Sequence, residues 1–289
     1  METNTITTVV MPLAIGIIML GLGLSLTLDD FRRVVVYPKA VAVGLLCQML
    51  VLPGAAYGLA VVFHLPPELA VGLMLLAASP GGATANLFSH LAHGDVALNI
   101  TITAVNSVLS LLTMPLIVNF ALTRFMGKGT VLPLQLDKIL QVFAIVLTPV
   151  AIGMLIRARR RSVSDALQKP VKILSAVFLL LVIVLAVAKE RVRIVDYAAA
   201  VGLPALLFNL ISLGAGYLIP LLVRVPRRQA IAIGMEVGIH NGTLAITIAS
   251  SPLLLNNLTM AMPAAVYSLI MFFTAAAFGW AVSRRPADV

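Results

Sequence analysis

The sequence predicts an all-α integral membrane protein with about nine transmembrane helices. Of its 289 residues, 61% are hydrophobic and only 11% are charged, whereas a soluble domain is about half apolar and about a quarter charged. The apolar residues form long continuous runs instead of the alternating pattern of a membrane β-barrel. The charged residues collect in short blocks between these runs.

Nine runs of roughly 20 residues are each long enough to cross a hydrocarbon layer of roughly 30 Å. They cover residues 9–28, 40–62, 67–89, 96–122, 139–157, 172–188, 198–222, 230–252 and 263–282. The first run ends in Asp29-Asp30 and not in a small-residue cleavage site, so we expect a retained transmembrane helix and not a signal peptide. The lone cysteine, Cys47, excludes an internal disulfide framework.

The basic residues predict the orientation of the chain. Alternating the nine spans places fourteen of the 20 lysines and arginines on one side and six on the other. Because basic residues favour the cytoplasmic side, we expect the N-terminus outside and the C-terminus inside. A net charge of +9 is thereby explained without a nucleic-acid partner. We expect a multi-pass protein of a bacterial inner (plasma) membrane, with the lipid bilayer as its surroundings and no obligatory protein partner.

Two of the predicted spans carry polar, helix-breaking stretches at mid-membrane. Residues 78–86 of the third span read ASPGGATAN, and residues 235–243 of the eighth read MEVGIHNGT. Backbone groups freed by such breaks are tolerated in a membrane only where protein or a water-filled cavity covers them. One interrupted helix in each half of the chain is typical of a secondary transporter built from inverted repeats.

Glu236 is the one acid of eleven that falls inside an apolar run and not at its end or in a loop. An ionisable group at this depth costs roughly 2.5–3.5 kcal/mol on insertion scales and marks a functional candidate. The alternative is a neutral carboxyl group hydrogen-bonded between helices. Because other polar groups cluster in the same stretch, a functional site is the better interpretation.

The fourth span carries a polar face made of Asn99, Thr103, Asn106 and Ser110, whose spacing places all four on one side of a helix. The alternative role is ordinary contact between membrane helices. Gln48 adds a lone amide to the second span. Carboxylate, amide, hydroxyl and freed backbone oxygens are the ligands of hard cations. With one formal negative charge among them, the set suits a monovalent cation such as sodium.

The chain resembles the bile acid:sodium symporter family over nearly its whole length. The resemblance lies in PGGATAN (residues 80–86) followed by HGDVALN (residues 93–99), in EVGIHNG (residues 236–242) and in the opening run GIIMLGLGLSLTLDDF. It implies a single transporter unit over residues 1–289, in the nine-span form, with two crossing discontinuous helices. The panel domain would comprise the spans at 9–28, 139–157 and 172–188, and the core domain residues 40–122 and 198–282.

The resemblance also implies the transported sodium ions and their ligands, one or two ions in number. The first ion would be held by Asn86, Asn99, Thr103 and Glu236. The family usually has serine where this chain has Ala85. The second ion would be held by Gln48, Glu236 and the backbone carbonyls of Val237 and Ile239, beside His240, where the family commonly has glutamine. An imidazole there would introduce a pH dependence.

For the substrate, the resemblance places Asn241 and Thr84 at the tips of the two broken helices, with Gly242 and Ala83 beside them. Bile-acid-binding members carry a Trp-His-Asn run in the last span, where this chain has the apolar residues 270–272. Bile acids are therefore a poor guess. Helix N-termini at the crossing attract anions, so we expect a small organic anion as substrate.

Two further carriers stay open at this stage. One is a proton-coupled organic acid carrier that uses Glu236 and His240. The other is an efflux carrier for an inorganic oxyanion such as arsenite. Such carriers use a thiol in the first broken helix, and residues 78–89 contain no cysteine, which disfavours this alternative. An enzyme is not expected, since the sequence has neither an HExxH pair nor paired intramembrane acids. His90 and His93 fit an interfacial position better than a metal site. The identity of the substrate, the number of sodium ions, the transport direction and the oligomeric state stay open.

Overall fold

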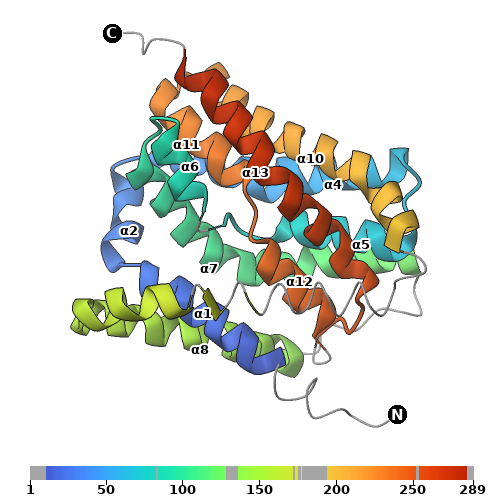
Figure 1. The fold of residues 1–289 in the computed structure, drawn as a ribbon, viewed down its shortest axis with the longest axis horizontal. Coiled ribbons are helices and arrows are strands. Elements are labelled where there is room, and N and C mark those ends of the chain that lie inside the picture. Colours follow the sequence, from blue (N-terminus) through green and yellow to red (C-terminus); the bar gives the residue numbers. More distant parts are fainter. Residues whose placement is uncertain are drawn as a thin grey trace.

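The computed structural model describes residues 11–82, 84–127, 136–171, 173–174, 177, 194–251 and 254–284. Within these ranges the regular structure is helical, apart from one isolated antiparallel bridge (Figure 1). Four helical stretches of the described chain are long and apolar enough to cross a membrane: Pro38–Val62, Val96–Met126, Ala199–Leu222 and Thr259–Ser283. The count of nine spans stays a prediction, because most of span 172–188 lies outside the described residues.

The described residues of the first half of the chain form seven α-helices and three short turns of other helix types. These are α1 (Met11–Ser25), α2 (Leu28–Arg32), the 3-10 turn η2 (Arg33–Val35), α3 (Pro38–Leu46), the π-helical turn η3 (Cys47–Val51), α4 (Leu52–Val62), α5 (Pro67–Ala78), α6 (Ala85–Leu91), α7 (Val96–Ala121) and the π-helical turn η4 (Leu122–Met126). The predicted second span is thus one continuous stretch, α3–η3–α4, with a π-helical turn at its centre.

The second half contains α8 (Leu136–Arg159), α10 (Ile194–Leu222), α11 (Arg227–Gly238), α12 (Gly242–Ser250), the 3-10 turn η5 (Thr259–Ala261) and α13 (Met262–Ser283). Both interruptions predicted from the sequence are present. One separates α5 from α6 and the other separates α11 from α12. At the first, Ser79 has extended backbone with ψ of 145°, because the proline that follows excludes this residue from the helical region.

The two broken helices form much of the interior of the protein. All residues from Leu69 to Ala78 in α5 and from Ala230 to Gly238 in α11 are buried. The long helix α7 packs against α5, α6 and α11, while α10 packs against α11 and α13. Large apolar side chains stay exposed along the long helices, among them Leu116 and Phe273, as expected of surfaces that face lipid.

Helices α1 and α8 pack as a close pair at the lower edge of the view in Figure 1. A Cβ atom on Gly23 of α1 would lie 2.1 Å from the carbonyl oxygen of Val150, so only glycine permits this approach. Within the segment that connects the predicted spans 139–157 and 172–188, residues 161–171 are helical. This helix is anchored to the end of α1, because Ser164 and Gln168 both donate side-chain hydrogen bonds to the Leu24 carbonyl, at 2.9 and 3.1 Å.

Candidate functional site

The two helix breaks lie against each other and are joined by backbone hydrogen bonds. Gly81 and His240 form an antiparallel bridge. The amide of Gly82 donates to the carbonyl of Ile239 at 2.6 Å, and the amide of Asn241 donates to the carbonyl of Pro80 at 2.9 Å. Each break therefore satisfies part of the backbone that the other has freed, as burial requires.

Glu236 lies one turn before the second break and is fully buried. The hydroxyl of Thr103 on α7 lies 2.6 Å from its Oε2, whereas its Oε1 has no hydrogen-bond partner in the described structure. Gly81 covers the carboxylate from the side of the first break. A Cβ atom there would approach Oε1 to 2.1 Å. The carboxylate is thus held by one hydroxyl and enclosed by backbone.

Two amide oxygens on the helices packed against α11 also lack hydrogen-bond partners among the described residues. On α7, the Nδ2 group of Asn99 donates to the carbonyl of Ala232 at 2.8 Å. This bond fixes the orientation of the amide and leaves its buried Oδ1 without a partner. On α6, the Oδ1 atom of Asn86 is likewise buried and has no partner in the described part of the chain. Helices α6, α7 and α11, which carry these groups, all pack on one another. Buried oxygens are normally hydrogen-bonded, so this set requires an explanation.

The polar face predicted on α7 divides into two parts. Asn99 and Thr103 belong to the set around Glu236. Asn106 and Ser110 are also buried, but Ser110 donates to the Ser107 carbonyl of its own helix at 3.0 Å. The Nδ2 group of Asn106 has no partner in the described structure. Among these four side chains, Thr103 is the one with a hydrogen bond to Glu236 in the described structure.

Gln48 and His240 form a second polar group at the crossing. Gln48 lies in the π-helical turn η3, a feature frequent at functional sites. Its Nε2 donates to the carbonyl of Ser79 at 2.9 Å. The Nδ1 atom of His240 lies 3.3 Å from the same carbonyl and 3.5 Å from Nε2 of Gln48. Because the closer neighbour is an acceptor, we assign the proton of the neutral imidazole to Nδ1.

Two acceptors of this second group then have no partner among the described residues. They are Nε2 of His240 and Oε1 of Gln48, both buried. The carbonyl of Val237 is also released, because the amide that would continue the helix, that of Asn241, donates to Pro80 instead. The carbonyl of Ile239, by contrast, already accepts the amide of Gly82. Of the predicted ligands of a second ion, Oε1 of Gln48 and the carbonyl of Val237 are thus available, whereas the carbonyl of Ile239 is already hydrogen-bonded.

The expected substrate residues lie at the tips of the helices that follow the breaks. Thr84 is half-buried and precedes α6, and Asn241 is half-buried and precedes α12. The Oδ1 atom of Asn241 caps α12 by accepting the Leu244 amide at 3.0 Å, so its Nδ2 group remains as a donor. Gly242 is buried against Ser268. Ala83 lies outside the described residues.

Sequence reasoning missed a polar group behind the second break. The carbonyl of Gly238, the last residue of α11, accepts hydrogen bonds from Nδ2 of Asn209 at 2.9 Å and from the hydroxyl of Tyr267 at 2.8 Å. The rings of Phe208 and Tyr267 flank His240 at centroid distances of 5.6 and 5.3 Å. Polar Asn209 inside the apolar run 198–222 was the signal that could have indicated this group.

The sequence profile of the Sodium Bile acid symporter family matches residues 12–197. The sodium-dependent transporter YocS of Bacillus subtilis is 29% identical over 88% of this chain and 77% of its own length. The probable sodium/metabolite cotransporter BASS1, chloroplastic, of Arabidopsis thaliana is 28% identical over 88% of this chain and 61% of its own. The human sodium-dependent organic anion transporter is 28% identical over 83% of this chain and 63% of its own.

This chain therefore spans less than two thirds of the length of the plant and human relatives. The family consists of transporters and not of enzymes, and the relatives above are named as sodium-dependent transporters or as a probable sodium/metabolite cotransporter. With a helical fold, several membrane-spanning helices and a profile match over well more than half of its residues, the chain belongs to the sodium bile acid symporter family.

Proposed function

We propose that this protein is a sodium-coupled symporter that carries a small organic anion by alternating access around the crossing of its broken helices. The observation that carries the proposal is the set of three buried oxygens without partners, Oε1 of Glu236 and Oδ1 of Asn86 and Asn99. A bound cation would satisfy all three at once. It would also compensate the negative charge of a carboxylate that lipid and protein otherwise isolate from water.

The proposed first sodium ion is bound by these three oxygens together with Thr103. When the hydroxyl of Thr103 donates to Oε2 of Glu236, its own lone pairs remain available as ligands. The set is composed of hard oxygen donors with a single formal charge, which suits an alkali cation better than a divalent or soft metal. Ala85 offers no hydroxyl oxygen, and the Asn99 amide oxygen supplies the additional ligand in its place.

The proposed second sodium ion would be bound by Gln48, Glu236 and the carbonyls of Val237 and Ile239. Two features weaken this second site. The imidazole nitrogen of His240 is a poorer ligand for sodium than the oxygen of a glutamine, and the carbonyl of Ile239 is engaged with Gly82. We therefore expect the first ion to bind more tightly than the second.

The number of ions decides how strongly the membrane potential drives uptake. Each unit charge that crosses 100 mV contributes about 2.3 kcal/mol, and a co-transported anion costs the same amount per negative charge. One sodium ion with a monovalent anion gives no net charge movement. Two sodium ions with a monovalent anion move one net positive charge. Because about 1.4 kcal/mol corresponds to a tenfold concentration ratio, this charge multiplies the accumulation ratio of the anion roughly fortyfold at 100 mV.

The anion would bind at the helix tips, next to the sodium sites. The Nδ2 group of Asn241, the hydroxyl of Thr84 and the N-terminal end of α12 all present donors or positive potential there. The relatives are described as carriers of metabolites and organic anions, which agrees with this class. The basic residues predict cytoplasmic ends for α2, α6 and α13 in a bacterial inner membrane.

The proposal is tested by uptake into proteoliposomes that contain the purified protein. An inward sodium gradient should drive accumulation of radiolabelled small carboxylates, and an equal potassium gradient should not. The variant Glu236→Gln should lose sodium-driven uptake. Sodium-driven uptake at the wild-type rate by Glu236→Gln would overturn the assignment of the cation site, and uptake driven by a pH gradient without sodium would overturn sodium coupling.

A further inference from the structure

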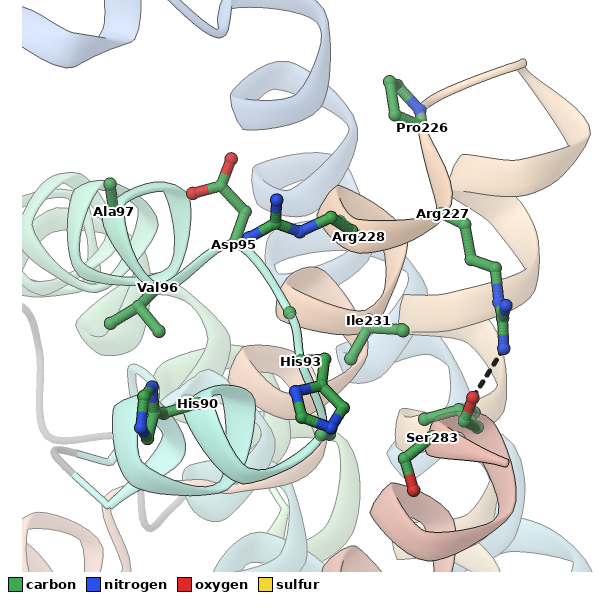
Figure 2. A pocket seen from close by; sticks show the side chains of 13 residues that line it. His90, His93, Asp95, Val96, Ala97, Pro226, Arg227, Arg228, Ile231 and Ser283 are labelled. Carbon is green, nitrogen blue, oxygen red and sulfur yellow. Dashed lines mark hydrogen bonds between the residues drawn. The ribbon is translucent and has the colours of Figure 1, made fainter. Parts of the chain in front are cut away.

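A pocket of about 960 Å³ opens at one end of the helices, away from the cation site. Figure 2 shows its walls: His90 and His93 at the end of α6, Arg227 and Arg228 in the first turn of α11, and Ser283 at the end of α13. Arg228 precedes Glu236 by two turns of the same helix, roughly 12 Å along its axis. The pocket is therefore a separate feature of the fold.

The first turn of α11 concentrates positive charge at this pocket. The N-terminus of a helix carries a positive partial charge, which acidic residues stabilise and basic residues do not. The first turn of α11 has no acidic residue and contains Arg227 and Arg228. Helix α7, whose start lies beside it, has its own carboxylate, because Asp95 caps it by accepting the Leu98 amide at 3.1 Å. The start of α11 lacks such a charge of its own.

The lining side chains differ in how they are held. The guanidinium of Arg227 donates to the carbonyl of Val282 at 2.5 Å, which fixes it on one wall. Arg228 is exposed, and in the described part of the chain its guanidinium has no ion-pair or hydrogen-bond partner. The imidazoles of His90 and His93 are exposed on the facing wall. Asp95 is the acid among the lining residues, and one of its oxygens is already engaged as the cap of α7.

A backbone hydrogen bond joins the two segments that carry the basic residues of the pocket. The amide of Asp95 donates to the carbonyl of Arg228 at 3.0 Å, which joins the turn between α6 and α7 to the start of α11. His93 adopts a left-handed backbone with φ of 59°, a conformation that histidine tolerates better than most residues. The basic groups are therefore presented by a defined scaffold and not by a free loop.

We propose that this pocket binds a phosphate-bearing anion. A guanidinium matches phosphate with two parallel hydrogen bonds, and the amides of a helix N-terminus form a further anion site. Two sources fit this chemistry, the headgroup of an anionic membrane lipid and a free phosphate compound. Nearby Trp280 is exposed, and the guanidinium of Arg284 lies 3.6 Å from the centre of its ring. Tryptophan and arginine in such positions mark the headgroup level of a bilayer, which favours the lipid source.

The test compares three probes on the purified protein in detergent, without sodium, by thermal unfolding. The probes are short-chain phosphatidylglycerol, phosphatidylcholine of the same chain length, and inorganic phosphate at constant ionic strength. The variants are Arg228→Gln and, as a matched control, Arg224→Gln, which removes an exposed arginine of the same connection that does not line the pocket. Because both side chains are exposed, both variants should fold.

We expect phosphatidylglycerol to raise the unfolding temperature more than phosphatidylcholine does. Its apparent Kd should increase about fivefold in Arg228→Gln, the effect of one basic residue at an anionic lipid, and should stay unchanged in Arg224→Gln. Inorganic phosphate acting alone to the same extent would identify the free anion as the ligand. Equal losses in the two variants would show general surface attraction and overturn the site, as would the absence of stabilisation by every probe.

Discussion

Replacing Gly81 by alanine is the sharpest steric test of the cation site. The added methyl group would lie 2.1 Å from Oε1 and 2.7 Å from Oε2 of Glu236, whereas ordinary contact begins at 3.4 Å. The carboxylate or the first break must therefore move by about 1.3 Å, the difference between 3.4 and 2.1 Å. Overpacking of this kind costs about 1–3 kcal/mol.

If Oε1 is a sodium ligand, this displacement moves the ligand away from the bound ion. We expect the apparent Kd for sodium of Gly81→Ala to rise by a factor between about five and more than a hundred, which corresponds to about 1–3 kcal/mol. Equilibrium binding of radioactive sodium to the purified protein in detergent measures this change directly. Competition with unlabelled sodium and with potassium gives the selectivity.

A matched control is available at Gly54 of α4, where an added Cβ atom meets nothing within 4 Å. Gly54→Ala should fold and bind sodium like the wild type, with a small gain in stability from removing a helical glycine, about 0.5–1 kcal/mol. If Gly81→Ala folds and binds sodium with wild-type affinity, the carboxylate is not a ligand in the geometry described, and the steric argument fails.

Three further changes probe the surroundings of the site. Thr103→Val should raise the Kd for sodium about tenfold or more, because hydrogen bonds to charged groups are worth about 1.5–3 kcal/mol. The control is Thr101→Val, which changes a buried threonine that bonds only its own helix and should leave sodium binding unchanged. Equal effects of the two substitutions would contradict the role of Thr103. His240→Gln should make uptake depend more steeply on sodium concentration, and an unchanged slope would exclude His240 as the residue that weakens the second ion. Tyr267→Phe removes one of two donors to the Gly238 carbonyl and should lower the free energy of unfolding by about 1 kcal/mol, measured by denaturation; no loss would show that Asn209 alone holds this helix end.

The sequence predicted the class of fold and the two helix breaks, because proline, glycine and a lone buried acid have strong local consequences in lipid. Helical spacing placed Thr103 on the polar face of α7, but its closeness to Glu236, 2.6 Å in the structure, was implied only by the family resemblance. The helix at 161–171 was not predicted, because its polar residues are typical of a segment that connects two spans. The structure shows that Ser164 and Gln168 bond the end of α1. Such a contact joins residues about 140 positions apart.

The residues around the Gly238 carbonyl were missed for a similar reason. Asn209 and Tyr267 lie 29 positions from it in opposite directions along the chain, and no local pattern links them. Asn99, Thr103, Asn106 and Ser110 share a helical face, but periodicity does not show which of them bonds the buried acid, as Thr103 does. The spacing of residues predicts which side of a helix they share, whereas the neighbouring helices decide which of those residues belong to a site.

The most direct test of the sodium site is thermal unfolding of the purified protein in NaCl and in KCl at equal ionic strength, for the wild type and Glu236→Gln. A ligand that binds the folded state alone stabilises it by about 2.7 kcal/mol at a concentration about a hundred times its Kd. The oxygen set around Glu236 predicts stabilisation of the wild type by sodium over potassium and its loss in Glu236→Gln. Equal stabilisation by the two salts, or a sodium effect that persists in Glu236→Gln, would contradict a sodium site at this carboxylate.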